Sequence, residues 1–179
     1  MHLDPIFIIA CALAIAVLLA SAATHKLRAP ARFAKQLADY QLLPYSVVRP
    51  IARVIPVVEL VIAFTLLVPA CRSWAALSAA SLIALYAAAM GLNLWRGRRD
   101  IDCGCAGPDQ AQPLRPLLLL RNSALVGLAL LASLLPVVRD LGFFDGFVTV
   151  AASATVLLIY AAADGLLANS PLLLKLIGR

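Results

Sequence analysis

Charged residues are scarce in this chain, and long parts of it have none. Only 13% of the 179 residues are charged, whereas 63% are hydrophobic and the mean hydropathy is +0.95. Soluble globular proteins are about 45–50% apolar and about 25% charged. Residues 5–24 and residues 73–95 carry no charge at all, and a helix of roughly 20 apolar residues is enough to cross a bilayer core. The composition excludes a soluble globular protein and predicts an integral membrane protein.

Three further apolar segments each contain a charged residue. Residues 54–71 are apolar except for Glu59, residues 116–138 except for Arg121, and residues 146–168 except for Asp164. The helices expected there lie near residues 51–71, 115–138 and 146–168. Because the runs are continuous rather than alternating, and lipid permits only helices or closed barrels, we expect helices. The sequence therefore predicts an all-α polytopic bundle of about five transmembrane helices. No internal repeat or second soluble domain is evident, so residues 1–179 are expected to form a single membrane domain.

The first apolar run lacks the basic segment that would precede it in a signal peptide, and it is longer than the apolar part of such a peptide, so we expect it to be retained. Lysines and arginines gather after the first helix, after the third helix and near the C-terminus. Five spans with the N-terminus outside place all three groups in the cytoplasm. The net charge of +6 is thereby explained as a topology signal in a bacterial inner (cytoplasmic) membrane, with no nucleic-acid partner. The loop at residues 96–114 is then cytoplasmic.

The segment at residues 25–46 has an amphipathic pattern. Phe33, Leu37 and Tyr40 recur at helical spacing, and charged residues occupy the other side. This pattern predicts a short helix lying in the membrane interface and ending near Pro44. Two interpretations are open: the helix anchors the first loop to lipid headgroups, or it covers the cysteine loop at residues 96–114 and receives a partner.

That loop contains the stretch "RGRRDIDCGCAGPDQ", in which Cys103 and Cys105 are separated only by Gly104. Such a pair closes a disulfide through a tight turn, and a glycine removes the Cβ penalty for that backbone conformation. A small strained ring is more easily reduced than a structural disulfide. Gly107, which precedes a proline, ends the turn. The spacing favours a redox pair of Cys103 and Cys105.

Histidine is scarce, which bears on whether this pair binds a metal. The only histidines are His2 and His25, and zinc requires about four ligands that are commonly Cys or His. No zinc site is therefore expected. A soft ion such as Cu(I) needs only two thiolates, so copper handling remains an alternative, and an inert or structural cysteine pair is another.

The order of several motifs resembles the MauE family of methylamine-utilisation membrane proteins, which are related to the DoxX-like redox-associated membrane proteins. The motifs are "KLRAPARFAKQLADYQLLP", "IPVVEL", "NLWRGRRDIDCGCAGP" and "LLLLRNSALVGLALL". The most specific element is the D-C-G-C-x-G block, followed about a helix start later by R-N. The resemblance covers roughly residues 20–130 and implies a core of about four helices.

The resemblance also carries an expected function. The family is linked to maturation of methylamine dehydrogenase, whose small subunit carries many disulfides, alongside a thioredoxin-like partner. It implies that Cys103 and Cys105 exchange thiols and disulfides in support of an exported, disulfide-rich client protein. The alternative is a non-catalytic membrane scaffold or accessory factor for the thioredoxin-like partner, in which the cysteines are structural.

Charged residues inside apolar helices are costly, and they are usually paired or functional. Glu59 and Arg121 lie at similar estimated depths, so that a Glu59–Arg121 pair is allowed. One interpretation is a packing ion pair. The other is a polar pocket beneath the cysteine loop, formed by Glu59, Arg121 and His25, which handles a proton or a quinone-like carrier. Asp164 lies close to a helix end and is expected to be interfacial.

Cys11 and Cys71 are the two remaining cysteines, and both fall near the outer face in the expected topology. They are candidates for a second thiol pair that passes electrons outward. Free cysteine is also an ordinary small apolar residue in buried helices, and nothing in their local sequence resembles a redox motif.

Overall fold

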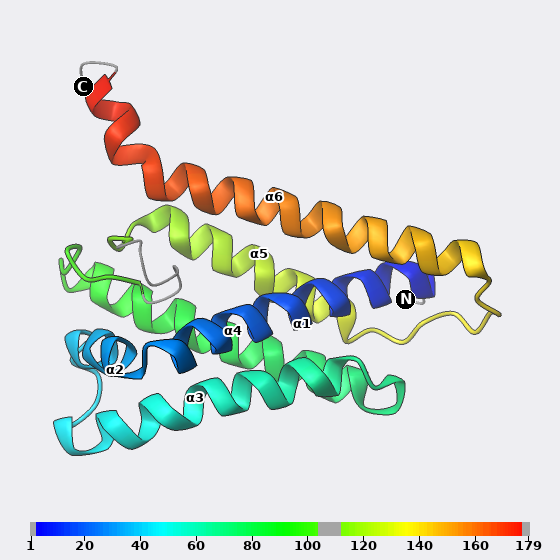
Figure 1. Ribbon diagram of the computed structural model, residues 1–179, viewed down its shortest axis with the longest axis horizontal. Coiled ribbons are helices and arrows are strands. Elements are labelled where there is room, and N and C mark those ends of the chain that lie inside the picture. The colour runs from blue at the N-terminus through cyan, green and yellow to red at the C-terminus, as the bar shows by residue number, and fades with distance from the viewer. Residues whose placement is uncertain (1–2, 104–111, 177–179) are drawn as a thin grey trace.

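The computed structural model describes residues 3–103 and residues 112–176. Within them the order of helices is α1 (Pro5–Arg28), α2 (Pro30–Asp39), α3 (Tyr45–Leu66), the short 3-10 turn η1 (Pro69–Cys71), α4 (Arg72–Trp95), α5 (Pro116–Ala132) and α6 (Phe143–Leu176). Five of these helices run side by side along the bundle, and α2 crosses one end of it (Figure 1). The all-α bundle predicted from the sequence is confirmed.

Prolines and one cap define several helix ends. The Asp4 side chain accepts a hydrogen bond from the Ile6 backbone N–H at 2.9 Å and so caps α1, which satisfies one of the free N–H groups of the first turn. Pro30 separates α1 from α2, because the residue before a proline is driven out of helical conformation. Pro116 occupies the first turn of α5, where its missing N–H costs nothing.

The core consists largely of alanine. α1 packs against α3, α5 and α6, while α4 packs against α5 and α3. Small side chains such as Ala16, Ala79 and Ala129 are buried where these helices meet, which lets helix backbones approach closely, as in membrane bundles. Large apolar side chains such as Phe64 and Leu158 point outward instead. This reversal of the soluble pattern suits a bundle surrounded by lipid.

Three helical stretches are long and apolar enough to cross a membrane: Pro5–Arg28, Pro69–Trp95 and Phe143–Asn169. α5 is apolar but has 17 residues, which is about 25 Å of helix. α3 has 22 residues and carries two arginines as well as Glu59. The chain is therefore a membrane protein, while the count of five spans stays a prediction.

Several expected boundaries differ from the observed ones. α3 begins at Tyr45 rather than near residue 51, and α6 is longer than the expected 146–168. α5 ends at Ala132 instead of near residue 138. Pro136 follows and cannot extend a helix, since it lacks an N–H. The chain there pairs with the N-terminal segment instead, with the Val137 N–H donating to the Leu3 carbonyl at 2.9 Å.

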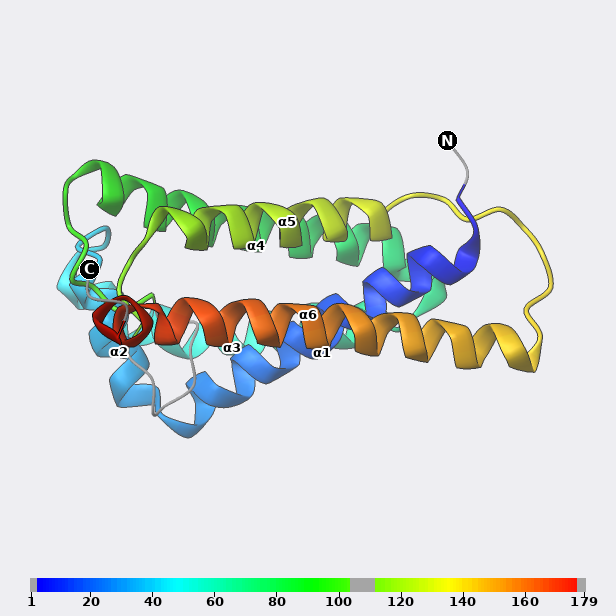
Figure 2. The same ribbon diagram turned by 90° about the horizontal axis from the view of Figure 1, so that it is seen from above.

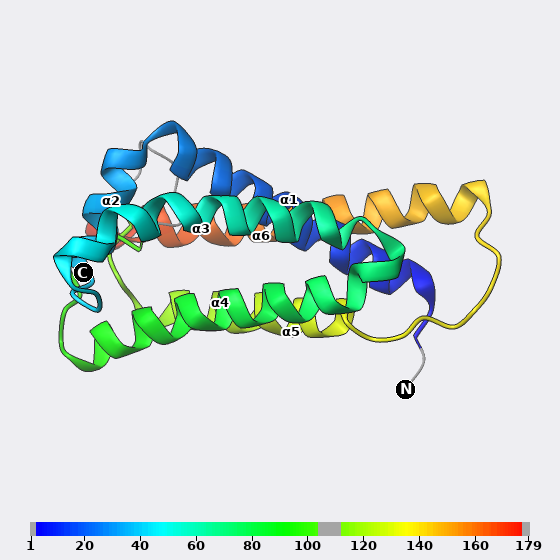
Figure 3. The same cartoon turned by 90° about the horizontal axis from the view of Figure 1, so that it is seen from below.

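The two ends of the bundle carry different features. Figures 2 and 3 show α2, the segment that leads to Cys103 and the C-terminal part of α6 at one end, and the start of α1 and the α3–α4 connection at the other. The cysteine segment and the amphipathic helix α2 thus meet at the same end of the molecule. The candidate site lies there.

Candidate functional site

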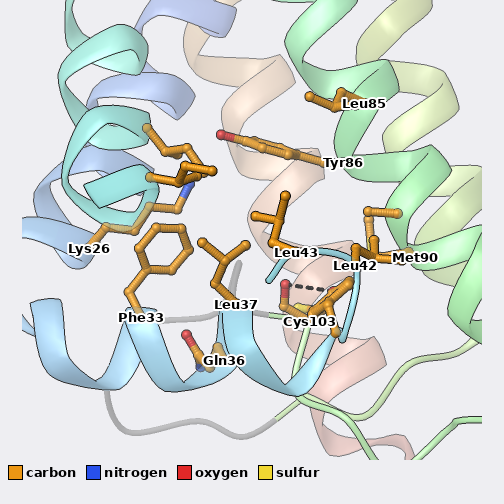
Figure 4. A pocket seen from close by; sticks show the side chains of 14 residues that line it. Lys26, Phe33, Gln36, Leu37, Leu42, Leu43, Leu85, Tyr86, Met90 and Cys103 are labelled. Atoms are coloured by element: carbon orange, nitrogen blue, oxygen red, sulfur yellow. Dashed lines mark hydrogen bonds between the residues drawn. The ribbon is translucent and has the colours of Figure 1, made fainter. Parts of the chain in front are cut away.

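A cavity of about 370 Å³ lies between α2, α3 and α4 at this end. Most of its lining is apolar and comes from α2, the segment after it, α3 and α4. Lys26 reaches the cavity from the end of α1, and Cys103 contributes from the loop after α4 (Figure 4). The cavity therefore brings a cysteine of the predicted redox pair into a mostly apolar space with one cation.

Cys103 is held by backbone pairing across the base of its loop. Its N–H donates to the Gln112 carbonyl at 2.9 Å, and Asp102 and Pro113 form an antiparallel bridge. The Tyr40 hydroxyl donates to the Cys103 carbonyl at 3.2 Å. The Cys103 side chain is buried, with 7% of the residue exposed. Cys105, Gly104 and Gly107 lie outside the described residues, so the predicted turn and the Cys103–Cys105 pairing stay predictions.

The Cys103 thiol belongs to a polar network that continues into the bundle. Its Sγ donates to Gln112 Oε1 at 3.3 Å. The amide Nε2 of Gln112 donates to Asp164 Oδ1 at 3.4 Å, and Asp164 forms an ion pair with Arg121. The Arg121 guanidinium also lies 5.5 Å from the centre of the Tyr160 ring. Gln112 thus connects the thiol to a carboxylate and an arginine from two different helices.

α2 contacts the residue before the cysteine. Gln36 Nε2 donates to Asp102 Oδ2 at 2.7 Å, and Arg32 approaches the same oxygen at 3.4 Å. The other Asp102 oxygen accepts from the Gln112 N–H at 3.2 Å. These contacts are the ones expected if the amphipathic segment covers the cysteine loop. They come from the polar side of α2, while its apolar side, including Phe33, lines the cavity.

A second polar cluster borders the cavity at Lys26. The Lys26 ammonium forms an ion pair with Glu59, which is completely buried, and the Tyr86 hydroxyl donates to the same Glu59 oxygen at 2.9 Å. Lys26 Nζ also lies 5.1 Å from the centre of the Phe33 ring and 4.8 Å from that of Tyr86. Glu59 Oε2 has no hydrogen-bond partner among the described residues.

The predicted Glu59–Arg121 pair is wrong. Glu59 pairs with Lys26, and Arg121 pairs with Asp164. The reason is helix order: α3, which carries Glu59, packs against α1, α2 and α4, whereas α5, which carries Arg121, packs against α4 and α1. The expectation that Asp164 is merely interfacial is also wrong, because it is the carboxylate partner of Arg121.

The other predicted residues, His25, Cys11 and Cys71, do not line the cavity. The Nδ1 of His25 is buried with no partner in the described part of the chain. Cys11 is half-buried against the alanine core, and Cys71 is exposed at the end of η1; both are free thiols. The first part of α1 and the α3–α4 connection, which contain these two cysteines, lie towards the end of the bundle opposite α2 (Figure 1).

Sequence reasoning missed Lys26, Tyr86 and Gln112. Lys26 closes the first apolar run, and Tyr86 is a lone phenol within the charge-free residues 73–95, so both carried a weak signal. Gln112 carried none, because its role depends on the chain folding back beside Cys103. Across the described residues, no three His, Cys, Asp or Glu side chains form a group that could hold a metal ion.

The sequence of this chain matches one known protein family over most of its length. The family model described as "Methylamine utilisation protein MauE" matches residues 4–136, a span that includes both polar clusters except for Asp164 and Tyr160. The chain belongs to the MauE family. Two MauE relatives, from Methylophilus methylotrophus and Paracoccus denitrificans, are 39% and 38% identical to it, each over 90% of this chain and over 86% and 88% of their own length.

A third MauE relative, from Methylorubrum extorquens, is 41% identical over 82% of this chain and 80% of its own length. All three carry the name "Methylamine utilization protein MauE". No solved structure matches the chain. The chain is thus a membrane-embedded MauE protein, in a family named for methylamine utilisation.

Proposed function

We propose that this MauE protein is a membrane thiol–disulfide redox protein whose exchanging pair is Cys103 and Cys105. It supports the maturation of an exported, disulfide-rich client by way of a thioredoxin-like partner. The single observation that carries the proposal is the position of Cys103. Its thiol is buried between an apolar cavity and a polar network through Gln112, instead of being packed in the alanine core.

The position suits exchange chemistry for two reasons. Burial keeps stray oxidants away from the sulfur, since oxidation of cysteine follows exposure and thiolate character. The contacts of Tyr40, Gln36 and Gln112 fix the backbone around Cys103, so that the thiol keeps one orientation. A cysteine used only for packing has no need of this set of polar partners.

The exchange proceeds through a mixed disulfide. With the pair in its disulfide form, a partner thiolate attacks one sulfur, and the other sulfur leaves as a thiolate. A second partner thiolate then attacks the mixed disulfide and releases the pair as a dithiol. The partner loses two electrons and two protons to become a disulfide, and Cys103 and Cys105 gain them.

The test is a complementation experiment in a methylamine-using bacterium whose own MauE gene is deleted, with both cysteines replaced in the chain that is supplied. We expect the unaltered chain to restore growth on methylamine. The Cys103→Ser/Cys105→Ser variant should not restore growth, although its amount in the membrane should equal that of the unaltered chain. Cys71→Ser is the matched control, because this thiol is exposed at the opposite end, and it should restore growth. Growth with the double variant would instead support a scaffold without exchange chemistry.

We also propose that the protein lies in the bacterial inner membrane with Cys103 at the cytoplasmic end. The basic residues Arg28, Arg32 and Arg98 lie at this end, consistent with the positive-inside rule. An impermeant maleimide should label Cys105 only after the cells are opened, whereas Cys71 should be labelled in spheroplasts. Labelling of Cys105 in spheroplasts would reverse the orientation and put the pair on the same side as an exported client.

A further inference from the structure

The cavity beside Cys103 has more space than the redox pair itself requires. Cys103 contributes one wall, and the remainder is formed mostly by apolar and aromatic side chains, together with Lys26 and Gln36. A cavity of about 150 Å³ holds a benzene ring, so the observed volume of about 370 Å³ accommodates a substituted ring system. It also falls within the common size range of small-molecule sites.

One side chain borders both the cavity and the outside of the bundle. Leu85 lines it, yet 64% of this residue is exposed on the outside of α4. Leu85 lies ten residues before the end of α4 at Trp95, which is about 15 Å along the helix axis. Leu85 thus separates the cavity from the outside of α4, and this is the side from which an apolar molecule dissolved in the bilayer would enter.

Lys26 provides the polar feature that distinguishes this space from an acyl-chain groove. An ammonium has three donors, and one of them is used by Glu59. The ion pair is surrounded by the Phe33 and Tyr86 rings and is shielded from water. A cation in such surroundings stabilises negative charge developing on a ligand oxygen far better than it does in water. Glu59, whose second oxygen lacks a partner in the described residues, holds Lys26 in place.

We propose that this cavity binds the ring of a lipid-soluble quinone, which re-oxidises Cys103 and Cys105. The inference rests on the proposed function. One quinone oxygen accepts a hydrogen bond from Lys26, and the ring lies against Cys103. The two thiols form a disulfide and give up two electrons and two protons; the quinone takes them up and leaves as the quinol. Atoms and electrons balance without another reagent.

The test uses the full-length protein, reduced and placed in lipid nanodiscs without oxygen, with decylubiquinone as the probe. We expect loss of the quinone absorbance with one quinone consumed for each pair of thiols lost. Exchange of the same samples with glutathione disulfide reports the redox pair independently of the cavity.

Two phenylalanine variants on α4 test the cavity. Ala89 lines it, whereas Ala88 is exposed on the same helix and does not. Ala89→Phe should fill the cavity, so that quinone reduction is lost while exchange with glutathione disulfide continues. Ala88→Phe should retain both reactions. If Ala89→Phe does not fold, Lys26→Met/Glu59→Leu serves instead: removing both charges should weaken decylubiquinone binding about 10- to 100-fold, the value of a hydrogen bond to a charged group.

The outcomes separate the two claims. No exchange with glutathione disulfide would contradict the proposed function itself. Normal exchange with no quinone reduction, or equal reduction by Ala89→Phe and Ala88→Phe, would overturn the quinone site and leave the exchange function standing. In that case an acyl chain of the bilayer occupies the cavity.

Discussion

Gln112 is the residue on which the two sides of the site depend. Its amide oxygen accepts from the Cys103 thiol, and its amide nitrogen donates to the Asp164 carboxylate. A glutamine can perform both tasks because its side chain carries an acceptor and a donor. The Gln112 side chain therefore places a neutral amide next to the Cys103 sulfur and separates the sulfur from the Asp164 carboxylate.

Changing Gln112 to glutamate should lower the reactivity of the Cys103 thiol. A carboxylate beside Cys103 disfavours the thiolate, which is the reactive form, and it also faces Asp164. We expect Gln112→Glu to lower the rate of iodoacetamide modification at neutral pH by about tenfold, with the pH–rate profile moved to higher pH. Gln41→Glu makes the same change at an exposed position and should leave the profile unchanged. An unshifted profile in Gln112→Glu would show that the hydrogen bond does not control the thiol.

Lys26 and Glu59 form the other polar pair at the residue scale. Removing one partner of a buried ion pair leaves an uncompensated charge and costs roughly 3–5 kcal/mol, whereas an apolar replacement of both is often neutral. Lys26→Met and Glu59→Leu should each lower the thermal midpoint of the solubilised protein, and the double variant should recover most of the loss. A double variant that loses as much as the two single variants combined would contradict a direct pair.

At the scale of elements, α2 acts as a cover for the cysteine segment. Its Gln36 and Arg32 both contact Asp102, and Tyr40 at its end contacts the Cys103 carbonyl. Amphipathic helices at a membrane interface usually bury one face in lipid. Here the apolar face lines the cavity, while the polar side chains Gln36 and Arg32 bind the segment that carries Cys103.

Weakening that cover should expose the thiol. Gln36→Leu removes the 2.7 Å hydrogen bond to Asp102, which is worth about 1 kcal/mol, so we expect maleimide labelling of Cys103 to accelerate about fivefold. Lys35→Leu is the matched control, because Lys35 is the neighbouring exposed residue on α2. Equal acceleration in both variants would indicate a general loosening of α2 and no specific role for Gln36.

At the opposite end of the bundle, ion pairs of Arg139 connect the segment before α1 to the first turn of α6. Arg139 donates to Asp4 at 3.0 Å and to Asp145 at 2.9 Å, next to the backbone bond between Val137 and Leu3. The hydrogen bonds from the Arg139 side chain, together with one from the Ile6 N–H, lower the pKa of Asp4 below its ordinary value of 3.8. Because the pKa is lowered on folding, the ion pair between Arg139 and Asp4 is present above the ordinary value and is lost as pH falls through the lowered one.

Hydrogen exchange at Val137 should report this dependence. Corrected for the intrinsic rate, its protection should stay constant from neutral pH down to about the ordinary pKa of Asp4 and fall only in stronger acid. Asp4→Asn should give low protection at every pH, and Asp140→Asn, which alters a neighbouring exposed carboxylate, should behave like the unaltered protein. A loss of protection beginning near pH 6 would point to a different titrating group.

At the scale of the whole molecule, charge-free runs are enough to predict a helical membrane bundle, because a bilayer leaves helices as the main option for continuous apolar segments. The ends of the helices were harder to predict. The end of α5 depends on Pro136 and on pairing with Leu3, more than a hundred residues earlier in the chain. Contacts of that range leave no periodic pattern in a single sequence.

In the candidate site, too, the sequence singles out some residues but does not identify their partners. Cys103, Glu59 and Arg121 stood out as unusual residue types in an apolar chain, and each belongs to a polar cluster at or near the cavity. Their partners could not be inferred, since estimated depth gives a position along a helix and not which helix lies next to it. Only the folded bundle identifies the partners, because α1 packs beside α3 and so brings Lys26 to Glu59, while Asp164 of α6 meets Arg121 of α5.

The central claim is that Cys103 and Cys105 cycle between dithiol and disulfide. The most direct measurement is the mass of the peptide that contains both, taken from membranes of Cys11→Ala/Cys71→Ser cells after acid quenching and alkylation. We predict two species: a doubly alkylated dithiol after brief treatment with reductant, and an unalkylated disulfide, lighter by two hydrogens than the free dithiol, once the reductant is removed. A peptide that stays doubly alkylated under both conditions would contradict the account.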